Sequence, residues 1–218
     1  MLFHPIRQMV SAGITDILIV TSAEHMGDVV RCLGSGAEFD CSLTYKVQEK
    51  PRGIAHALGM AEDFAAGKDI CVMLGDNVFS ESIAPFAASF RDQNSGARVV
   101  LKNVDDPERY GVAALDEKHV ISIEEKPSEP KSDYAVVGLY FYDSRVFDDI
   151  REIEPSGRGE LEITTVNNRY IERGELHYDI YAGRWTDAGT FDSLHEANQI
   201  LLECGNDIEA PETIKKVG

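Results

Sequence analysis

The chain has 218 residues, and a hydrophobic content of 43% is enough to build the core of one large domain or two small ones. Lys and Arg number 21 against 38 Asp and Glu, so the formal net charge is −17 at pH 7. This charge repels phosphodiester backbones and anionic lipid surfaces, which argues against a nucleic-acid or membrane partner, while local cations can still bind a small phosphorylated ligand.

The cysteines show no Cys-x-x-Cys spacing and lie in or beside apolar runs, which is typical of reduced, packed thiols: Cys32, Cys41, Cys71 and Cys204. No apolar stretch approaches the roughly 18 residues of a membrane span, and no basic-plus-apolar leader follows Met1. These features predict a cytoplasmic location.

Helical and strand-like patterns alternate in the first half of the chain, which predicts parallel β-α units with helices on both faces of a sheet. The expected elements are a helix over 3–10 ended by Gly13, a strand over 16–21, a helix over 24–33 capped by Thr21 and Glu24, a strand over 43–47, a helix over 54–65 opened by Gly53, a strand over 70–74 and a helix over 80–90. The run ICVML at 70–74 is apolar on both sides, which is typical of a central strand.

Beyond Gly96 the pattern changes to strand-like runs that no long helix separates, which predicts antiparallel or mixed sheet. The expected strands cover 97–104, 110–115, 119–125 and 134–142, and helices follow over 159–171 and 190–204. In the last helix the predicted buried face is Phe191, Leu194, Ala197 and Leu201.

Two acidic residues follow strand-like runs. Asp76 stands between Gly75 and Asn77 directly after ICVML, and Asp187 follows a short segment that ends in Trp185. Ligands of α/β sheets bind outside the carboxyl ends of strands, and two converging carboxylates are what a Mg²⁺ carrying a nucleotide phosphate requires. A turn or a helix N-cap is the alternative interpretation of each residue.

The sequence gives a weaker indication of which basic residues would bind a phosphate group. Lys126 follows Glu124 and Glu125 at a strand end and precedes Pro127, so the chain turns there with a charge pair at the bend. A solvated turn is the alternative interpretation, and Arg158 and Lys131 can equally be surface charges.

Taken together, seven segments in a fixed order resemble the sugar-1-phosphate nucleotidyltransferases, and most closely the short glucose-1-phosphate thymidylyltransferases. They are VQEKPRGIAHAL, VMLGDNVF, DDPERYGVA, IEEKP, YAVVGLYFYD, SGRGELEITTVNNRY and GRWTDAGTFDSLHEAN. The resemblance implies a Rossmann-like α/β fold, with a mixed, mainly parallel sheet and helices on both faces. It also implies one domain over 1–218, with a nucleotide-binding half at 1–96 and a sugar-phosphate-binding half at 97–218, and a possible homo-oligomer.

The resemblance also implies roles for individual residues. Gln48 would bind the pyrimidine edge, Gly53 would let the backbone approach the nucleotide, and Asp76 and Asp187 would hold Mg²⁺, with Asp76 also contacting the nucleotide. The hexose pocket would be lined by Asn77, Gly111, Glu125 and Val137, and the phosphate of the sugar 1-phosphate would be held by Lys126 and Arg158. In this scheme Asp76, Lys126 and Arg158 are the catalytic residues.

The implied reaction joins dTTP, or UTP, to glucose 1-phosphate and releases pyrophosphate. The family's N-terminal strand, its Gly-rich loop with a Gly-Thr-Arg core and the following Lys-Pro have no counterpart in this sequence, so we expect the first, central strand to be missing and turnover to be weak or absent. A start codon placed too late, a truncation and a genuine short variant are the competing explanations. The alternative function is a non-catalytic relic of the family that binds a sugar phosphate or a nucleotide sugar.

Overall fold

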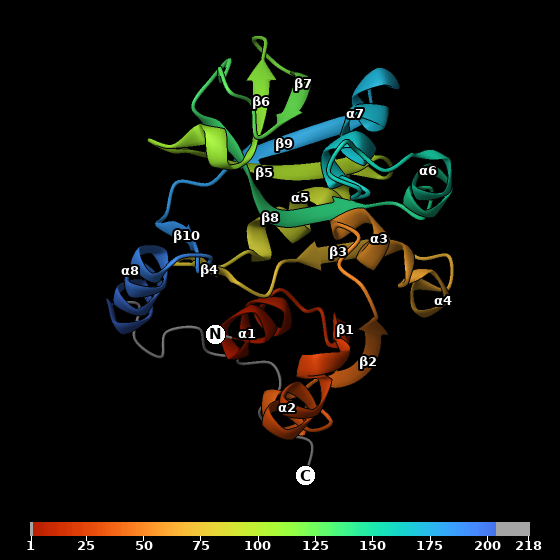
Figure 1. The fold of residues 1–218 in the computed structure, drawn as a ribbon, viewed down its shortest axis with the longest axis vertical. Coiled ribbons are helices and arrows are strands. Elements are labelled where there is room, and N and C mark those ends of the chain that lie inside the picture. The colour runs from red at the N-terminus through yellow and green to blue at the C-terminus, as the bar shows by residue number, and fades with distance from the viewer. Residues whose placement is uncertain (1, 204–218) are drawn as a thin grey trace.

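The computed structural model describes residues 2–203, in which a larger mixed sheet carries helices on both faces and two separate pairs of strands lie beside it (Figure 1). The helices are α1 (Phe3–Ser11), α2 (Ala23–Leu33), η1 (Ala37–Phe39), α3 (Ile54–Gly59), α4 (Glu62–Ala65), α5 (Ala84–Gln93), η2 (Pro107–Arg109), α6 (Val146–Glu152), α7 (Ile163–Glu172) and α8 (Phe191–Glu203). The strands are β1 (Asp16–Ser22), β2 (Ser42–Gln48), β3 (Ile70–Met73), β4 (Asn77–Phe79), β5 (Ala97–Asn103), β6 (Gly111–Leu115), β7 (Val120–Glu125), β8 (Tyr134–Tyr142), β9 (Leu176–Ile180) and β10 (Trp185–Asp187). The predicted α/β class is confirmed.

The predicted mainly parallel sheet is wrong for the described residues. Of their seven strand pairs, only β1 with β2 and β5 with β9 are parallel. The larger sheet has the order β7-β6-β8-β5-β9, with β3 also paired to β8. The strands from β5 to β8 follow one another without an intervening α-helix, and such short connections join antiparallel neighbours.

The strand over 70–74 does not occupy the centre of a sheet. Within residues 2–203, β3 pairs only with β8, and β1 pairs only with β2. No described strand lies between β1 and β3. The apolar pattern of ICVML correctly indicated burial on both faces, but it carries no information about whether a neighbouring strand is present.

The larger sheet separates two hydrophobic clusters, and β8 contributes to both because successive side chains point to opposite faces. Its even-numbered residues Val136, Tyr140 and Tyr142 pack with α3, α6 and α7. Its odd-numbered residues, such as Leu139 and Phe141, pack with α1 and α5. A third cluster packs α1 and α2 against β1 and β2.

Helix α1 is anchored to the segment that follows the predicted metal-binding loop. The backbone N–H of Phe79 donates to Nε2 of His4 at 3.1 Å, and the backbone N–H of Ile83 donates to Oε1 of Gln8 at 3.2 Å. Burial is the main cause that lowers the pKa of His4 to about 4. The imidazole is therefore neutral at pH 7 and accepts the Phe79 hydrogen bond.

Several local predictions need correction. The expected cap of α2 by Thr21 and Glu24 is absent, because β1 continues to Ser22 and the helix begins at Ala23 without a side-chain cap. The helix predicted over 54–65 is two short helices. The short strands β4 and β10, helix α6 and strand β9 were not predicted.

The predicted buried face of α8 is correct in part. Ala197 is buried and Leu201 packs beside it, but Phe191 is 93% exposed, and Ser193 and Ile200 are buried instead. The described cysteines Cys32, Cys41 and Cys71 are free thiols, and Cys204 lies outside the described residues. No helix in the described part of the chain is long and apolar enough to cross a membrane.

Candidate active site

A cavity of about 180 Å³ opens beside the C-terminal end of β3, between strands of the larger sheet, the β4–β10 pair and helix α7. Six of the residues singled out from the sequence line it: Asp76, Asn77, Gly111, Glu125, Lys126 and Asp187. They come from segments that are far apart in the chain, so the fold assembles a polar site that no single segment contains.

The pairing of β4 with β10 brings the two acids that were predicted to hold a metal into this cavity. In the antiparallel register Asp187 stands opposite Asn77, and the backbone N–H of Ala188 donates to the carbonyl oxygen of Asp76 at 2.9 Å. Asp76 and Asp187, which are more than a hundred residues apart, therefore occupy adjoining positions at one edge of the cavity.

Asn77 is buried, with only 2% of its surface exposed, and its side chain forms hydrogen bonds with three neighbouring residues. Its Oδ1 accepts hydrogen bonds from the backbone N–H of Gly138 at 2.9 Å and from Nε1 of Trp185 at 2.7 Å, and its Nδ2 donates to Oδ1 of Asp76 at 2.8 Å. A Cβ on Gly138 would lie 2.8 Å from the Asn77 side chain, so only glycine allows this close packing. Asn77 thus fixes the orientation of the Asp76 carboxylate.

Asp187 is held by a cation that the sequence analysis did not select. Nη2 of Arg109 donates to both Asp187 carboxylate oxygens, at 3.2 and 3.3 Å, while Nη1 donates to Asp106 at 2.7 Å. Burial, followed by the charge of Asp187, raises the pKa of the neighbouring Tyr110 hydroxyl well above its usual range. Arg109 and Tyr110 both lie in the segment DDPERYGVA, whose match to the family was the available signal.

Glu125 and Lys126 also line the cavity. Oε2 of Glu125 accepts a hydrogen bond of 2.5 Å from the Thr164 hydroxyl. Lys126 adopts φ of +45°, an uncommon conformation for a residue with a side chain, and its backbone N–H donates to the carbonyl of Tyr110 at 2.9 Å. Among residues 2–203 no carboxylate lies within ion-pair distance of the Lys126 ammonium, which leaves this cation available to a ligand.

Arg158 lies outside the cavity lining but is connected to it. Its guanidinium makes an ion pair of 2.9 Å with Glu162 and one of 3.4 Å with Glu125, and its side chain is 44% exposed. Because Glu125 and Glu162 both line the cavity, Arg158 is placed at its rim with one exposed side.

Besides Arg158, three more predicted residues do not line the cavity. The side chain of Val137 is fully buried on the opposite face of β8, while its neighbours Val136 and Gly138 face the cavity. Gln48 donates to the Gly53 carbonyl at 3.4 Å, and Gly53 has φ of +94°. A Cβ on Gly53 would lie 2.4 Å from the Leu161 carbonyl oxygen, so the close approach that requires glycine here is to the protein backbone.

The donor set fits a hard divalent cation such as Mg²⁺, which is commonly bound by one or two carboxylates, waters and substrate phosphates. Asp76 and Asp187 supply that pair. The described residues contain no cluster of three or more His, Cys, Asp or Glu side chains arranged as a complete protein-only site. The metal would therefore depend on phosphate oxygens for its remaining ligands.

Comparison with known proteins gives a consistent result. The family model described as nucleotidyl transferase matches residues 1–203. The chain is 43% identical to a glucose-1-phosphate thymidylyltransferase of Neisseria meningitidis over 211 residues, which covers 94% of this chain and 73% of that protein.

Solved structures show the same similarity. A Bacillus anthracis protein assigned as a glucose-1-phosphate thymidylyltransferase, crystallised in complex with sucrose, superposes with a TM-score of 0.87 at 54% identity, covering 91% of this chain and 81% of that one. A UDP-glucose pyrophosphorylase complexed with UDP-glucose superposes with a TM-score of 0.79 at 19% identity, covering 92% of this chain and 85% of that one. At that identity the second similarity bears on the fold alone.

Proposed function

The chain belongs to the nucleotidyl transferase family, and from this premise we propose that its cavity binds a sugar 1-phosphate and joins it to a nucleoside triphosphate. The proposed substrates are glucose 1-phosphate with dTTP or UTP, and the products are the nucleotide sugar and pyrophosphate. The observation that carries this proposal is the cavity itself, which is lined by the carboxylates of Asp76 and Asp187, by Glu125 and by Lys126, a cation without an ion-pair partner among residues 2–203.

The sugar would bind on the Glu125 side. The Thr164 hydrogen bond fixes one Glu125 oxygen, and the other can accept hydrogen bonds from sugar hydroxyls. The backbone at Gly111 borders this part of the cavity, where a Cβ would lie 3.2 Å from the Thr164 hydroxyl oxygen. We assign the wall of this pocket on β8 to Val136 and Gly138 in place of the Val137 side chain.

Lys126 and Arg158 would hold the sugar phosphate. Lys126 stands in the cavity without a carboxylate partner among the described residues, and Arg158 can turn from Glu125 and Glu162 toward an anion at the rim. Two cations at one phosphate neutralise its charge and orient its attacking oxygen toward the α-phosphorus of the triphosphate.

Mg²⁺ held by Asp76 and Asp187 would neutralise charge on the triphosphate when it is bound. Asn77 keeps the Asp76 carboxylate oriented, and Arg109 must release or share Asp187 for the metal to bind there. Gln48, the last residue of β2, is proposed to contact the base of the nucleotide. The protein backbone at Gly53, just before α3, is proposed to approach the nucleotide.

Binding of glucose 1-phosphate tests the sugar-phosphate site without requiring turnover. Isothermal titration of the full chain should give one site per chain, and Lys126→Met should weaken it by about tenfold or more, the value expected for loss of a charge-assisted contact. Lys131→Met is the matched control, since Lys131 is 65% exposed and pairs only with Glu124 among the described residues. Equal binding by wild type and Lys126→Met would contradict the proposal.

Pyrophosphate release distinguishes the transferase from the binding relic. We expect weak turnover by this chain alone with dTTP, glucose 1-phosphate and Mg²⁺, because the Gly-Thr-Arg loop expected for the triphosphate has no counterpart in its sequence. Any release should disappear in Asp187→Asn. Sugar-phosphate binding together with a complete absence of release for both dTTP and UTP would favour the non-catalytic alternative.

A further inference from the structure

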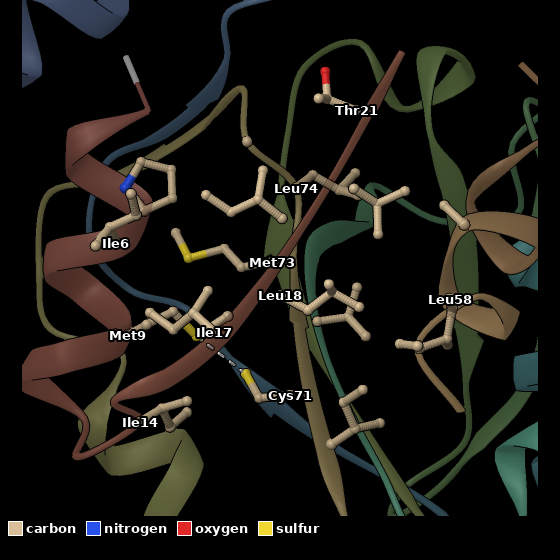
Figure 2. Close-up of a pocket in the computed structure, with 18 of the residues that line it drawn as sticks. Ile6, Met9, Ile14, Ile17, Leu18, Thr21, Leu58, Cys71, Met73 and Leu74 are labelled. Carbon is tan, nitrogen blue, oxygen red and sulfur yellow. Dashed lines mark hydrogen bonds between the residues drawn. The ribbon is translucent and has the colours of Figure 1, made fainter. Parts of the chain in front are cut away.

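The cavity proposed to bind the sugar 1-phosphate has different walls from a larger cavity, of about 310 Å³, between β1 and β3. The larger cavity is bordered mainly by apolar side chains, among them Ile17, Leu18 and Met73 (Figure 2). The cavity of about 180 Å³ is lined by acidic and basic side chains and by the amides of Asn77 and Asn167. Asn167 belongs to this polar lining, but neither the proposed metal site nor the proposed phosphate site uses it.

The side-chain amide of Asn167 is hydrogen-bonded at one end only. Asn167 lies on α7 with 1% of its surface exposed, and its Oδ1 accepts a hydrogen bond of 2.6 Å from the hydroxyl of Tyr142. Its Nδ2 is also buried but has no hydrogen-bond partner among residues 2–203. A buried donor without a partner costs about 1–3 kcal/mol, so such groups are rare in folded proteins and call for a functional explanation.

Tyr142 determines which end of the amide is left for the cavity. The tyrosine is fully buried, its hydroxyl has a single hydrogen to donate, and Oδ1 of Asn167 accepts it. A rotated amide would place Nδ2 against the tyrosine oxygen and leave the hydroxyl hydrogen without this acceptor. Because Asn167 lines the cavity and Tyr142 does not, the donor end of the amide is the end available to a ligand.

Asn167 lies deeper in the protein than the rim of the cavity. Thr164, which donates to Glu125, stands one turn before Asn167 on α7, so the two side chains project from the same side of the helix. Glu162, which is ion-paired with Arg158, precedes Asn167 by five residues, or about 7–8 Å along the helix axis. The side chain of Arg158 is 44% exposed and Asn167 is 1% exposed, so this wall runs inward from the rim to Asn167.

We propose that Nδ2 of Asn167 donates a hydrogen bond to one hydroxyl oxygen of the bound hexose, at carbon 3 or carbon 4, on the part of the ring away from the phosphate. The site would thereby select a sugar 1-phosphate that carries this hydroxyl over one that lacks it. This inference rests on the proposed function, because it takes the position of the phosphate from Lys126 and Arg158.

A hydroxyl group fits this position because its oxygen accepts from Nδ2 while its own hydrogen is free to be donated to an acceptor such as a carboxylate oxygen. A methylene group in its place would leave Nδ2 buried and unpaired in the complex. Sites that hydrogen-bond a substrate hydroxyl reject analogues without it for this reason, and they do so more strongly than apolar pockets reject a change in size.

Isothermal titration with glucose 1-phosphate and its 2-deoxy, 3-deoxy and 4-deoxy analogues tests the assignment on the full chain. The 3-deoxy or the 4-deoxy analogue should bind to the wild type about tenfold or more weakly than glucose 1-phosphate. The 2-deoxy analogue lacks the hydroxyl beside the phosphate-bearing carbon and is the control ligand. Its affinity relative to glucose 1-phosphate should be the same in the wild type and in variants of Asn167.

Two variants remove the donor. Asn167→Leu keeps a similar side-chain size but leaves the Tyr142 hydroxyl without its acceptor, so the double variant Tyr142→Phe/Asn167→Leu removes both partners and orphans neither. In both variants the affinity ratio between glucose 1-phosphate and the rejected analogue should fall to within about threefold. Circular dichroism and thermal unfolding establish that the fold is retained, and the double variant carries the test if Asn167→Leu alone does not fold.

Asn168→Leu is the matched control on the same helix. Nδ2 of Asn168 donates to the carbonyl of Ile123 at 2.8 Å, its Oδ1 accepts from the N–H of Ile123 at 3.0 Å, and the residue is not part of the cavity lining. This variant loosens the packing of α7 without changing the cavity wall, so the wild-type affinity ratio should be kept.

The outcomes separate this inference from the proposed function. A wild-type affinity ratio in the double variant would overturn the inference, because other groups would then provide the discrimination. Loss of the ratio in Asn168→Leu would also overturn it, because the packing of α7 would then set the selectivity. Binding of glucose 1-phosphate by the wild type without discrimination among the deoxy analogues would overturn this inference alone, whereas absence of glucose 1-phosphate binding would overturn the proposed function as well.

Discussion

One guanidinium nitrogen of Arg109 contacts both carboxylate oxygens of Asp187, at 3.2 and 3.3 Å, in the cavity proposed to bind a divalent cation. A metal and an arginine compete for the same lone pairs, and their positive charges repel. Arg109 therefore opposes the binding of a metal at Asp187 until a negatively charged ligand is present to receive the guanidinium.

Replacement of Arg109 by glutamine should tighten the binding of Mn²⁺, used as a spectroscopic substitute for Mg²⁺, by about threefold to tenfold in the absence of nucleotide. Electron paramagnetic resonance of free Mn²⁺ measures this affinity directly. Arg31→Gln, on the exposed surface of α2, is the control and should leave the affinity unchanged. Weaker Mn²⁺ binding by Arg109→Gln would show that the arginine supports the site instead of competing for it.

Asp187→Asn and Asp76→Asn should each weaken Mn²⁺ binding by about tenfold or more, because each removes one negative ligand of a two-carboxylate site. In an active form of the protein Asp187→Ala should cost several kcal/mol of transition-state stabilisation, measured as the loss of pyrophosphate release. Asp105→Asn serves as the control acid, since Asp105 lies outside the cavity lining. Unchanged metal affinity in both Asp187→Asn and Asp76→Asn would remove the basis for the metal assignment.

Gly138→Ala should destabilise the protein by about 1–3 kcal/mol, since the added methyl would lie 2.7 Å from the Leu74 side chain and 2.8 Å from Asn77. Urea unfolding monitored by the fluorescence of Trp185 provides the measurement. Gly157→Ala is the matched control, because no atom outside its chain neighbours lies within 4 Å of the added methyl. Equal stability of the two variants would mean that Asn77 can move away without cost.

The stability of the protein should fall as the pH decreases from about 6.5 toward 4, in part because of His4. The folded pKa of about 4 lies below the unfolded value of 6.5, so the unfolded chain binds more protons in this window. The contribution is fully present above pH 6.5 and should amount to about 2–3 kcal/mol lost at the acid end.

His4→Gln separates this effect from the titration of carboxylates. Glutamine can still accept the hydrogen bond from the backbone N–H of Phe79, but it does not titrate. The difference in unfolding free energy between wild type and His4→Gln should therefore change between pH 4 and 6.5 and stay constant above it. His25→Gln, at an exposed position of α2, should follow the wild-type curve.

The sequence predicted that Asp76 and Asp187 lie close together because each follows the end of a strand-like run. The two residues adjoin even though the strands that bring them together, β4 and β10, are antiparallel. The match of the segment DDPERYGVA to the family marked the region of Arg109, but not its contact with Asp187, since the two residues are 78 positions apart. The sequence also did not show that the Val137 side chain lies outside the cavity lining and that Val136 belongs to it. Every residue from Ala135 to Tyr142 is buried, so the hydrophobic pattern does not reveal which face of β8 meets the cavity.

The boundaries of strands were predictable to within about one residue where an apolar run ends at glycine, as in β3. The short pair β4 and β10 was not, because each has three residues and its existence depends on a partner more than a hundred positions away. The roles of all the predicted site residues remain predictions, including those of Gln48, Gly53 and Arg158. The ligand titrations described above would test the role of Arg158 once Arg158→Gln is included.

The separation of β1 and β2 from the larger sheet has a consequence for cooperativity. This pair is hydrogen-bonded only to itself among the described strands, and side-chain packing with α1 and α2 is its main attachment to the rest of the molecule. Side-chain contacts across a partly open space are weaker than a continuous ladder of backbone hydrogen bonds, so residues 16–48 form a natural sub-global unfolding unit. In denaturant this unit would open before the sheet that contains β8, giving two transitions in a chain of single-domain size.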